Sequence, residues 1–468
     1  MVFSESVFLY VLFPLAIGSY FLCRNLLYRN LILLGLSLIF YAWGEPVFVV
    51  NMVLASLVAY VGGLLIDRFR IQGRPRDCQT AFVITTILLI GNLGVFKYLN
   101  FFCDNLELLL GISLPVPEIR LPIGISFYTF QILSYVIDLY RGKVKTQRNF
   151  LYLTLYVSFF PQLIAGPIVR YETVEAEIRC RHSSLEDVTV GLKRFIRGMA
   201  KKVILANNTA LIAEIIYGGD AAIFGTGFYW GAAVAYTLQI YFDFSGYSDM
   251  AIGLGRIFGF HFLENFDAPY TSRSITEFWR RWHISLSTWF RDYVYIPLGG
   301  NRVSRRRWLF NTLVVWFLTG LWHGAQWNFV LWGLYNCAFL LVEKRLAKVL
   351  EKLPGVVRWL YTMIAVCIGW VIFNLVDFSQ MKEALHTMFL YRPGDMMAAV
   401  AADSRLLHGL LYLPLAALCC VPWKRREQTG EEGPMAVAAE NLCYLAVFGL
   451  CILFVISSSY NPFIYFRF

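Results

Sequence analysis

The chain has 468 residues, of which 58% are hydrophobic and only 15% are charged. Soluble proteins carry about 25% charged residues, so this composition excludes an ordinary soluble protein and indicates an integral membrane protein. The net charge of +10 does not indicate nucleic-acid binding, because the basic residues lie in short loops between apolar runs. The aromatic residues and basic residues that line a hydrophilic nucleic-acid groove are missing.

The apolar runs predict an all-α, polytopic membrane protein. A spanning helix needs about 20 mostly apolar residues, and we expect about eleven such helices together with interfacial and re-entrant ones. The first run follows Glu5 and has neither a basic segment before it nor a small-residue cleavage site, so we expect a retained helix. The expected spans are residues 6–23, 29–43, 46–66, 80–96, 122–140, 150–168, 226–243, 308–322, 326–343, 357–375, 406–422 and 437–457.

Loops that are rich in Lys and Arg separate several of these runs. Short loops of this kind are cytoplasmic in membrane proteins. We treat residues 1–468 as a single membrane domain whose motifs are concentrated in about residues 120–335. The basic clusters are Arg68, Arg70, Arg74 and Arg76; Arg141, Lys143, Lys145 and Arg148; Arg302, Arg305, Arg306 and Arg307; and Lys424, Arg425 and Arg426.

The cysteine and histidine patterns predict neither a structural metal nor a disulfide framework. The ten cysteines form no CxxC pair, and the six histidines show no zinc-binding spacing. We therefore expect no bound metal.

Prolines and a glycine interrupt the apolar run at residues 150–168. Pro161, Gly166 and Pro167 predict a broken helix. At membrane depth, a broken helix is tolerated only where it is buried in protein or lines a cavity.

The run from Val188 to Lys202 predicts an amphipathic helix. Cations lie on one helical face and apolar side chains on the other, as in helices that lie in the plane of the membrane interface. A cytoplasmic helix that is docked on the bundle fits the same pattern.

Two carboxylates, Asp243 and Asp249, lie within an apolar segment. Because a buried Asp is rarely unpaired, we expect each to have a cationic partner or to contact a polar substrate. The possible partners are Arg256, Arg280 and Arg291.

The segment 278–287 combines aromatic, basic and hydroxyl side chains. If it is one helix, four of them fall at i, i+3, i+4 and i+8 on one face, with Arg280 and Arg281 beside that face. Such a face can offer hydrogen bonds and positive charge to a phosphate-bearing or thioester ligand. An interfacial helix anchored at the lipid headgroups fits the composition equally well. The four residues are Trp279, Trp282, His283 and Ser287.

His323 lies between two apolar runs, in a segment that also contains Trp322 and Asn328. An ionisable side chain at membrane depth is costly, so it usually faces a protein interior or a water-filled cavity and marks a functional site. A neutral imidazole can also accept a proton near neutral pH, which makes His323 a candidate general base. The alternative is a structural histidine that is hydrogen-bonded between helices.

These segments together resemble the membrane-bound O-acyltransferase family. The resemblance is to its bacterial branch of alginate O-acetylation and teichoic-acid D-alanyl transfer proteins, and is closer to the former. The matching segments are residues 127–131, 160–167, 241–249, 279–287, 322–324 and 461–468.

The resemblance implies a helical bundle with a central tunnel, in which an acyl thioester meets an acceptor from the other side of the membrane. It implies that His323 is the catalytic histidine and that His283 is the second polar residue of the site. The donor would be acyl-CoA, in particular acetyl-CoA, or an acyl-carrier thioester, with no bound cofactor. The candidate substrate-binding residues are Trp279, Arg280, Arg281, Trp282, Ser287, Asp243, Asp249, Trp322 and Asn328.

The implied setting is the plasma membrane of a bacterium. The implied partners are the lipid bilayer, a polysaccharide acceptor and an extracytoplasmic acyltransferase of the SGNH type or another polymer-modifying protein. The alternatives are D-alanyl transfer from a carrier protein to teichoic acid, a transporter or flippase, and a non-catalytic scaffold of a surface-polymer complex. Transporters also use broken helices and polar groups near the midplane, but often contain inverted repeats, and none is visible here.

Overall fold

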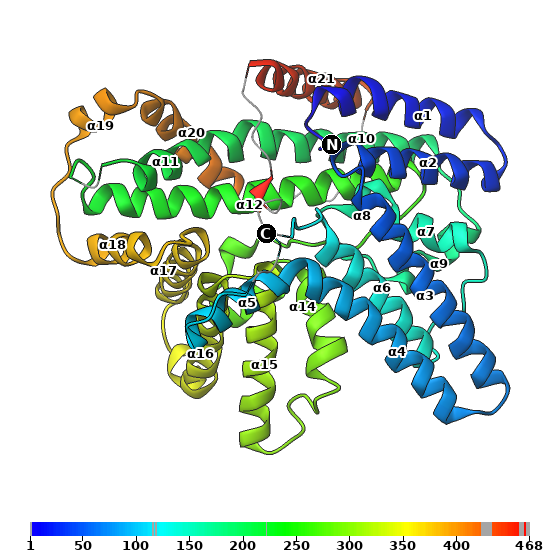
Figure 1. Ribbon diagram of the computed structural model, residues 1–468. Coiled ribbons are helices and arrows are strands. Elements are labelled where there is room, and N and C mark those ends of the chain that lie inside the picture. Colours follow the sequence, from blue (N-terminus) through cyan, green and yellow to red (C-terminus); the bar gives the residue numbers. More distant parts are fainter. Residues whose placement is uncertain are drawn as a thin grey trace. The chain divides into compact units, whose positions relative to one another are not determined.

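A computed structural model describes residues 2–114, 117, 119–220, 222–422, 433–457 and 463–464. Every regular element among these residues is a helix (Figure 1), which confirms the all-α expectation. The predicted basic loop at Lys424, Arg425 and Arg426, and most of segment 461–468, lie outside the described residues.

The chain divides into two compact units. The first comprises Met1–Phe195 and Ser248–Leu263, and the second comprises Ile196–Tyr247 and Glu264–Ile464. Two of the boundaries fall inside the long helices α10 (Leu185–Ala200) and α12 (Thr226–Ile257). That the whole chain acts as one functional domain stays a prediction.

The first unit contains a core helix, α6 (Ile125–Tyr140), which is buried on nearly all sides. Helices α3 (Phe48–Ile71) and α4 (Pro75–Leu93) pack side by side (Figure 1), and a side chain at Gly62 would overlap Thr85. The small residue therefore sets the distance between these two helices. The other helical segments of the unit are Phe8–Leu12, α1 (Phe13–Leu22), α2 (Leu26–Gly44), Gly94–Tyr98, α5 (Leu99–Leu110), α7 (Phe150–Ser158), α8 (Phe160–Leu163) and α9 (Tyr171–Arg179).

The break predicted within residues 150–168 lies at Phe159, between α7 and α8. Pro161 falls in the first turn of α8, where its missing N–H removes no helical hydrogen bond. The Phe160 N–H donates to Ser37 Oγ at 3.1 Å, so this backbone group is paired in the interior. The break is buried in protein, as a break at membrane depth requires.

In the second unit, α15 (Arg305–His323) and α16 (Trp327–Leu350) are in close backbone contact. A side chain at Gly320 would strike the carbonyl oxygen of Phe329, and one at Gly333 would strike that of Trp316. The remaining segments are Lys201–Ala206, α11 (Asn207–Gly218), Pro269–Thr271, α13 (Ile275–Arg281), α14 (Ile284–Phe290), Arg291–Tyr295, α17 (Gly355–Asn374), α18 (Phe378–Phe389), α19 (Met396–Ala402), α20 (Arg405–Cys419) and α21 (Pro434–Ser457).

Among the described residues, five helices are long and apolar enough to cross a membrane. Two shorter apolar helices, Phe8–Leu22 and Arg405–Cys419, also fall on expected spans. The chain is therefore a multi-pass membrane protein, and the expected number of about eleven crossings stays a prediction. The five spanning helices are Leu26–Gly44, Phe48–Ile71, Pro75–Leu110, Gly355–Asn374 and Pro434–Ser457.

The loop before α15 gives a test of membrane orientation. Ser304 caps α15, and His323 lies 16 residues beyond Arg307, or about 24 Å along a helix. If Arg307 lies at the cytoplasmic interface, His323 lies past the midplane of a ~30 Å hydrocarbon core. We expect Ser304→Cys to react with a membrane-impermeant maleimide only from the cytoplasmic side, because the loop is rich in arginine.

The wild-type chain, with its ten cysteines, supplies the background labelling for this measurement. Reaction from the outside alone contradicts the orientation.

Candidate active site

His323 is the last residue of α15 and is 3% exposed. Its ring centroid lies 5.0 Å from Trp322, 5.0 Å from Trp332 and 5.2 Å from Phe373, each in an edge-to-face arrangement. These neighbours come from α15, α16 and α17. The imidazole is therefore held in an aromatic box whose walls belong to three helices.

The turn after His323 packs tightly against the residues beside this box. Gly324 is extended, and a side chain there would strike the ring of Phe329. Asn328 is buried, and its Nδ2 donates to the Phe373 carbonyl oxygen at 3.0 Å. Asn328 therefore joins the start of α16 to the end of α17 beside the Phe373 wall.

Residues 278–287 do not form one continuous helix, so the condition for a shared helical face is not met. Helix α13 ends at Arg281, Trp282 is extended, and His283 adopts a left-handed conformation with φ 44° before α14 begins. The candidate residues therefore do not share one helical face, and Ser287 is half-buried on α14.

Asn265 causes this break, because it replaces the hydrogen bonds of the helix. Its backbone carbonyl accepts from the Ile284 N–H at 3.0 Å. Its Oδ1 accepts from the Ser285 N–H at 3.2 Å and from the Ser285 hydroxyl at 2.8 Å. His283 Nδ1 lies 3.1 Å from the same Oδ1.

The structure brings the two candidate histidines next to the same indole. The Trp322 ring centroid lies 5.8 Å from that of His283 and 5.0 Å from that of His323. His283 is buried, and Phe244 packs edge-to-face against it at 4.6 Å.

A cluster of tryptophans continues from the box. Trp332 contacts Trp279 at 5.4 Å, and Trp282 contacts Trp370 at 4.8 Å. Trp279 Nε1 also donates to Asn336 Oδ1 at 3.0 Å. The sequence interpretation missed Trp316, Trp332, Trp370 and Asn336. Helical spacing could have found Trp316, which lies seven residues before His323 on the same face.

Arg280 and Arg281 have different surroundings. Arg281 forms ion pairs with Asp267 at 3.3 Å and Glu277 at 3.1 Å, so its charge is neutralised locally. Arg280 is exposed and lines a cavity of about 610 Å³. The cavity also has Arg273, Lys344, Arg358, Glu343, Glu351 and Trp316 in its wall.

The wall of this cavity is connected to the aromatic box by packed indole rings. Trp316 lines the cavity, and its ring lies 6.3 Å from Trp332, which contacts His323. Glu343 accepts hydrogen bonds from the backbone N–H groups of Ile275 and Thr276 at the start of α13. The cavity is basic because four cationic side chains line it against the two carboxylates of Glu343 and Glu351.

The predicted partners of the two aspartates are wrong. Asp243 pairs with Lys202 at 2.5 Å, with both side chains buried. Its other oxygen accepts from the Ile464 N–H at 2.8 Å. Asp249 pairs with Arg194 at 3.0 Å within the first unit. A role for either aspartate in binding substrate stays a prediction.

Lys202 reaches Asp243 because the backbones approach closely. A side chain at Gly246 would lie 2.7 Å from the Gly198 carbonyl oxygen. Lys202 is therefore not part of the exposed cationic face that the sequence predicts for residues 188–202. Its ammonium also lies 4.5 Å from the centre of the Phe463 ring.

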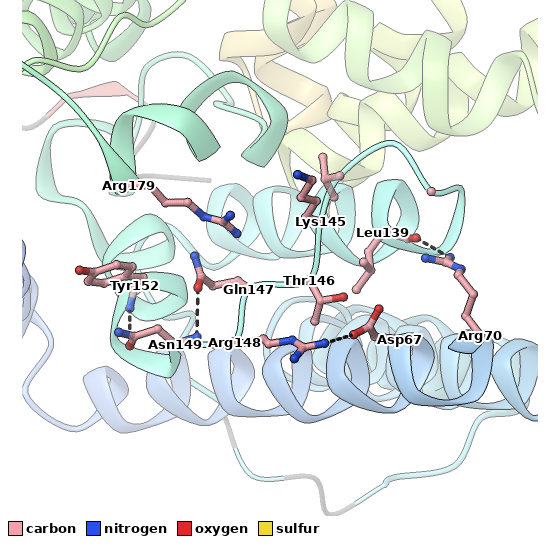
Figure 2. A pocket seen from close by; sticks show the side chains of 12 residues that line it. Asp67, Arg70, Leu139, Lys145, Thr146, Gln147, Arg148, Asn149, Tyr152 and Arg179 are labelled. Carbon is pink, nitrogen blue, oxygen red and sulfur yellow. Dashed lines mark hydrogen bonds and ion pairs between the residues drawn. The ribbon is translucent and has the colours of Figure 1, made fainter. Parts of the chain in front are cut away.

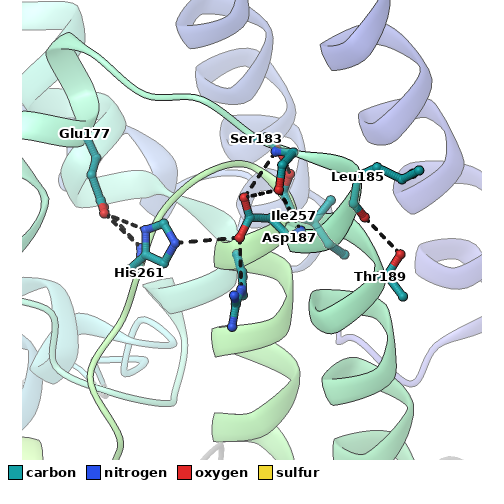
Figure 3. A network of polar contacts seen from close by, with 9 residues as sticks. Glu177, Ser183, Leu185, Asp187, Thr189, Ile257 and His261 are labelled. Carbon is teal, nitrogen blue, oxygen red and sulfur yellow. Dashed lines mark hydrogen bonds and ion pairs between the residues drawn. The ribbon is translucent and has the colours of Figure 1, made fainter. Parts of the chain in front are cut away.

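Arg256 and Arg291 are engaged elsewhere. Arg291 pairs with the adjacent Asp292 at 2.7 Å. Arg256 pairs with Asp187 at 3.1 Å, in a polar network of the first unit that also contains His261 (Figure 3). Hydrogen bonds from Ser184, followed by that from Arg256, hold the pKa of Asp187 below its usual value.

No group of three or more His, Cys, Asp or Glu residues within the described ranges is placed to hold a metal ion. That the chemistry is independent of metal stays a prediction.

The site lies in a region that matches a known family. Residues 143–379, which include His283 and His323, match the model of the membrane-bound O-acyltransferase family. The chain belongs to this family and is an O-acyltransferase.

Several bacterial proteins are similar to it, and the first two named here align with the whole chain. The probable alginate O-acetylase AlgI of Azotobacter vinelandii is 37% identical over 506 residues, covering 100% of both chains. The peptidoglycan O-acetyltransferase of Helicobacter pylori is 30% identical over 100% of this chain and 98% of its own. The teichoic acid D-alanyltransferase of Bacillus subtilis is 30% identical over 54% of this chain and 68% of its own.

The pair Lys202 and Asp243 gives a stability prediction. Removing one partner of a buried ion pair leaves the other charged and unpaired, at a cost of about 3–5 kcal/mol. We expect Lys202→Met to lower the free energy of unfolding by this amount, and Lys202→Met/Asp243→Leu to recover part of the loss. Denaturant unfolding in detergent measures both effects.

Arg405→Met is the matched control, because its pair with Asp403 is exposed. It should leave the unfolding midpoint unchanged. An equally small effect of Lys202→Met contradicts the structural role of the buried pair.

Proposed function

We propose that this O-acyltransferase moves an acetyl group from a thioester donor on the cytoplasmic side to a hydroxyl of a cell-surface or secreted polysaccharide. The observation that carries the proposal is the full-length similarity to alginate O-acetylases and to a peptidoglycan O-acetyltransferase. The D-alanyltransferase of Bacillus subtilis aligns with only 54% of the chain. Acetyl transfer is therefore favoured over D-alanyl transfer.

In the proposed reaction, His323 acts as general base. It takes the proton of the acceptor hydroxyl as the oxygen attacks the thioester carbonyl carbon. A C–O bond forms, the C–S bond breaks, and the departing thiolate receives the proton from the imidazolium. General base catalysis of this kind contributes about 10²–10⁴-fold to the rate.

His283 is proposed to position a reactant beside His323. The Ser285 N–H can only donate, so the atom of Asn265 that it contacts is the acceptor oxygen. His283 Nδ1 must then carry the proton that points to this oxygen. The other ring nitrogen, Nε2, is thereby kept in the form that accepts a hydrogen bond, such as one from the acceptor hydroxyl.

The cavity beside Arg280 is proposed to bind the phosphate groups of an acyl-CoA donor. Arg273, Arg280, Lys344 and Arg358 supply positive charge, and guanidinium groups bind phosphate oxygens well. The cavity includes Trp308 and Thr312 on the first turns of α15, next to the arginine-rich loop that we expect in the cytoplasm. The thioester arm would extend past Trp316 toward His323.

The proposed setting is a bacterial plasma membrane. An extracytoplasmic acyltransferase, rather than the polymer itself, is the alternative direct acceptor, and an acyl carrier protein is the alternative donor. Thioester hydrolysis or transfer by the purified, reconstituted protein, measured with each candidate donor and acceptor in turn, would distinguish these alternatives.

His323→Ala should reduce acyl transfer by about two orders of magnitude or more. A purely structural histidine would behave differently, because its truncation leaves buried partners unpaired and costs about 1–3 kcal/mol of stability. Initial rates of thioester turnover and the thermal midpoint, measured on the same preparation, separate the two roles. Exposed His386, mutated to Ala, is the control. Normal turnover by folded His323→Ala protein would refute the assignment.

Arg280→Ala should raise the KM for acetyl-CoA about 10- to 150-fold, with kcat little changed. The reason is that a charge-assisted hydrogen bond to the donor phosphates contributes about 1.5–3 kcal/mol to binding. Steady-state kinetics against donor concentration measures the effect. Arg302→Ala removes an exposed cation that does not line the cavity and should leave KM unchanged. Equal KM values for both variants would contradict this donor site.

A further inference from the structure

A second basic cavity, of about 730 Å³, lies in the first unit (Figure 2). It is enclosed by the end of α3, the loop from α6 to α7, the first turns of α7 and the end of α9. Arg70 on α3 donates to the carbonyl oxygens of Leu139 at 2.7 Å and Tyr140 at 2.8 Å. Two loops that the sequence separately predicts to be cytoplasmic therefore meet at this cavity.

The lining of the cavity carries excess positive charge. Its charged groups are Arg70, Lys145, Arg148 and Arg179 against one carboxylate, Asp67. Asp67 is engaged by Arg148 at 3.1 Å, and Arg179 pairs with Glu175 of the same helix at 3.4 Å. Lys145 is exposed and has no carboxylate partner among the described residues. The cavity can therefore accept a further negative charge.

Neutral hydrogen-bond donors also reach the lining. The Thr146 hydroxyl is buried and forms no hydrogen bond within the described part of the chain. Thr146 lies between Lys145 and Gln147 on the loop that crosses the cavity (Figure 2). A ligand with several acceptor oxygens, such as a phosphate ester, would satisfy both the hydroxyl and the cations.

The surroundings favour a lipid as the source of this phosphate. Helix α3 is one of the membrane-crossing helices, and the cavity lies at its end. Next to the cavity, Tyr60 of α3 donates to the carbonyl oxygen of the lining residue Arg148 at 2.9 Å. The Tyr60 ring also packs against Phe150 of α7, with 5.5 Å between the ring centroids. Leu57 on α3 and Leu151 on α7 are exposed apolar residues near this contact.

We propose that this cavity binds the headgroup of an anionic phospholipid, with the acyl chains along the apolar surfaces of α3 and α7. Basic pockets at the cytoplasmic ends of membrane helices bind acidic lipid headgroups in this way. The site lies in the first unit and is independent of the acyl-transfer proposal, which concerns residues of the second unit.

The test is binding of phosphatidylglycerol and phosphatidylcholine to the full-length protein in detergent, measured by native mass spectrometry and by thermal stabilisation. We expect the wild type to retain phosphatidylglycerol selectively. Lys145→Ala/Arg179→Ala should weaken this binding about 25-fold, because each basic residue near an anionic lipid contributes about fivefold. Phosphatidylcholine binding should not change.

Arg68→Ala/Arg76→Ala is the matched control, because it removes two exposed cations, one near the end of α3 and one at the start of α4, that do not line the cavity. It should retain phosphatidylglycerol like the wild type. Equal retention by the cavity variant and the control variant would overturn the proposal. Millimolar inorganic phosphate that stabilises the protein as strongly as the lipid would also overturn it, since the site would then take free phosphate.

Discussion

The close backbone contact between α15 and α16 is the constraint on which the candidate site depends. Gly320 and Gly333 leave room only for the backbone of the opposite helix. His323 and Trp332 extend from these two helices, and their rings meet at 5.0 Å because the helices are so close. A larger residue at either glycine would separate the rings and open the box around the imidazole.

The same requirement for dense packing shapes the polar groups of both units. A charge away from water is tolerated when an opposite charge and hydrogen bonds accompany it. Lys202 with Asp243 meets this condition in the second unit. Arg181 in the first unit instead donates hydrogen bonds to neutral partners, including Asn30 and Tyr20. These groups fix the helices that carry them, whereas Arg280 and Lys145 face cavities and remain able to bind a ligand.

Local patterns in the sequence predicted the helices and the break near Pro161, because each depends on residues close together in the chain. The catalytic role of His323 rests on the same kind of local pattern and stays a prediction. The turn at His283 could not be predicted in this way, since Asn265 causes it from 18 residues away. The partner of Asp243 lies 41 residues earlier and is selected by the close approach at Gly246. Trp370 likewise joins the aromatic cluster only through the packing of α17. Sequence periodicity identifies the faces of helices, but the folded contacts decide which faces meet.

Because the backbone of His283 is left-handed, a substitution at this position changes both the stability of the protein and the chemistry of the side chain. A side chain other than glycine is strained in this conformation by about 1–3 kcal/mol, and the bonds of Asn265 hold it there. Glycine would relieve the backbone strain but would also remove the imidazole. Lower strain and the proposed role of the side chain therefore oppose each other at this residue. Screens that select only for a more stable protein would therefore favour glycine at position 283 and lose the imidazole to which we assign the proposed positioning role.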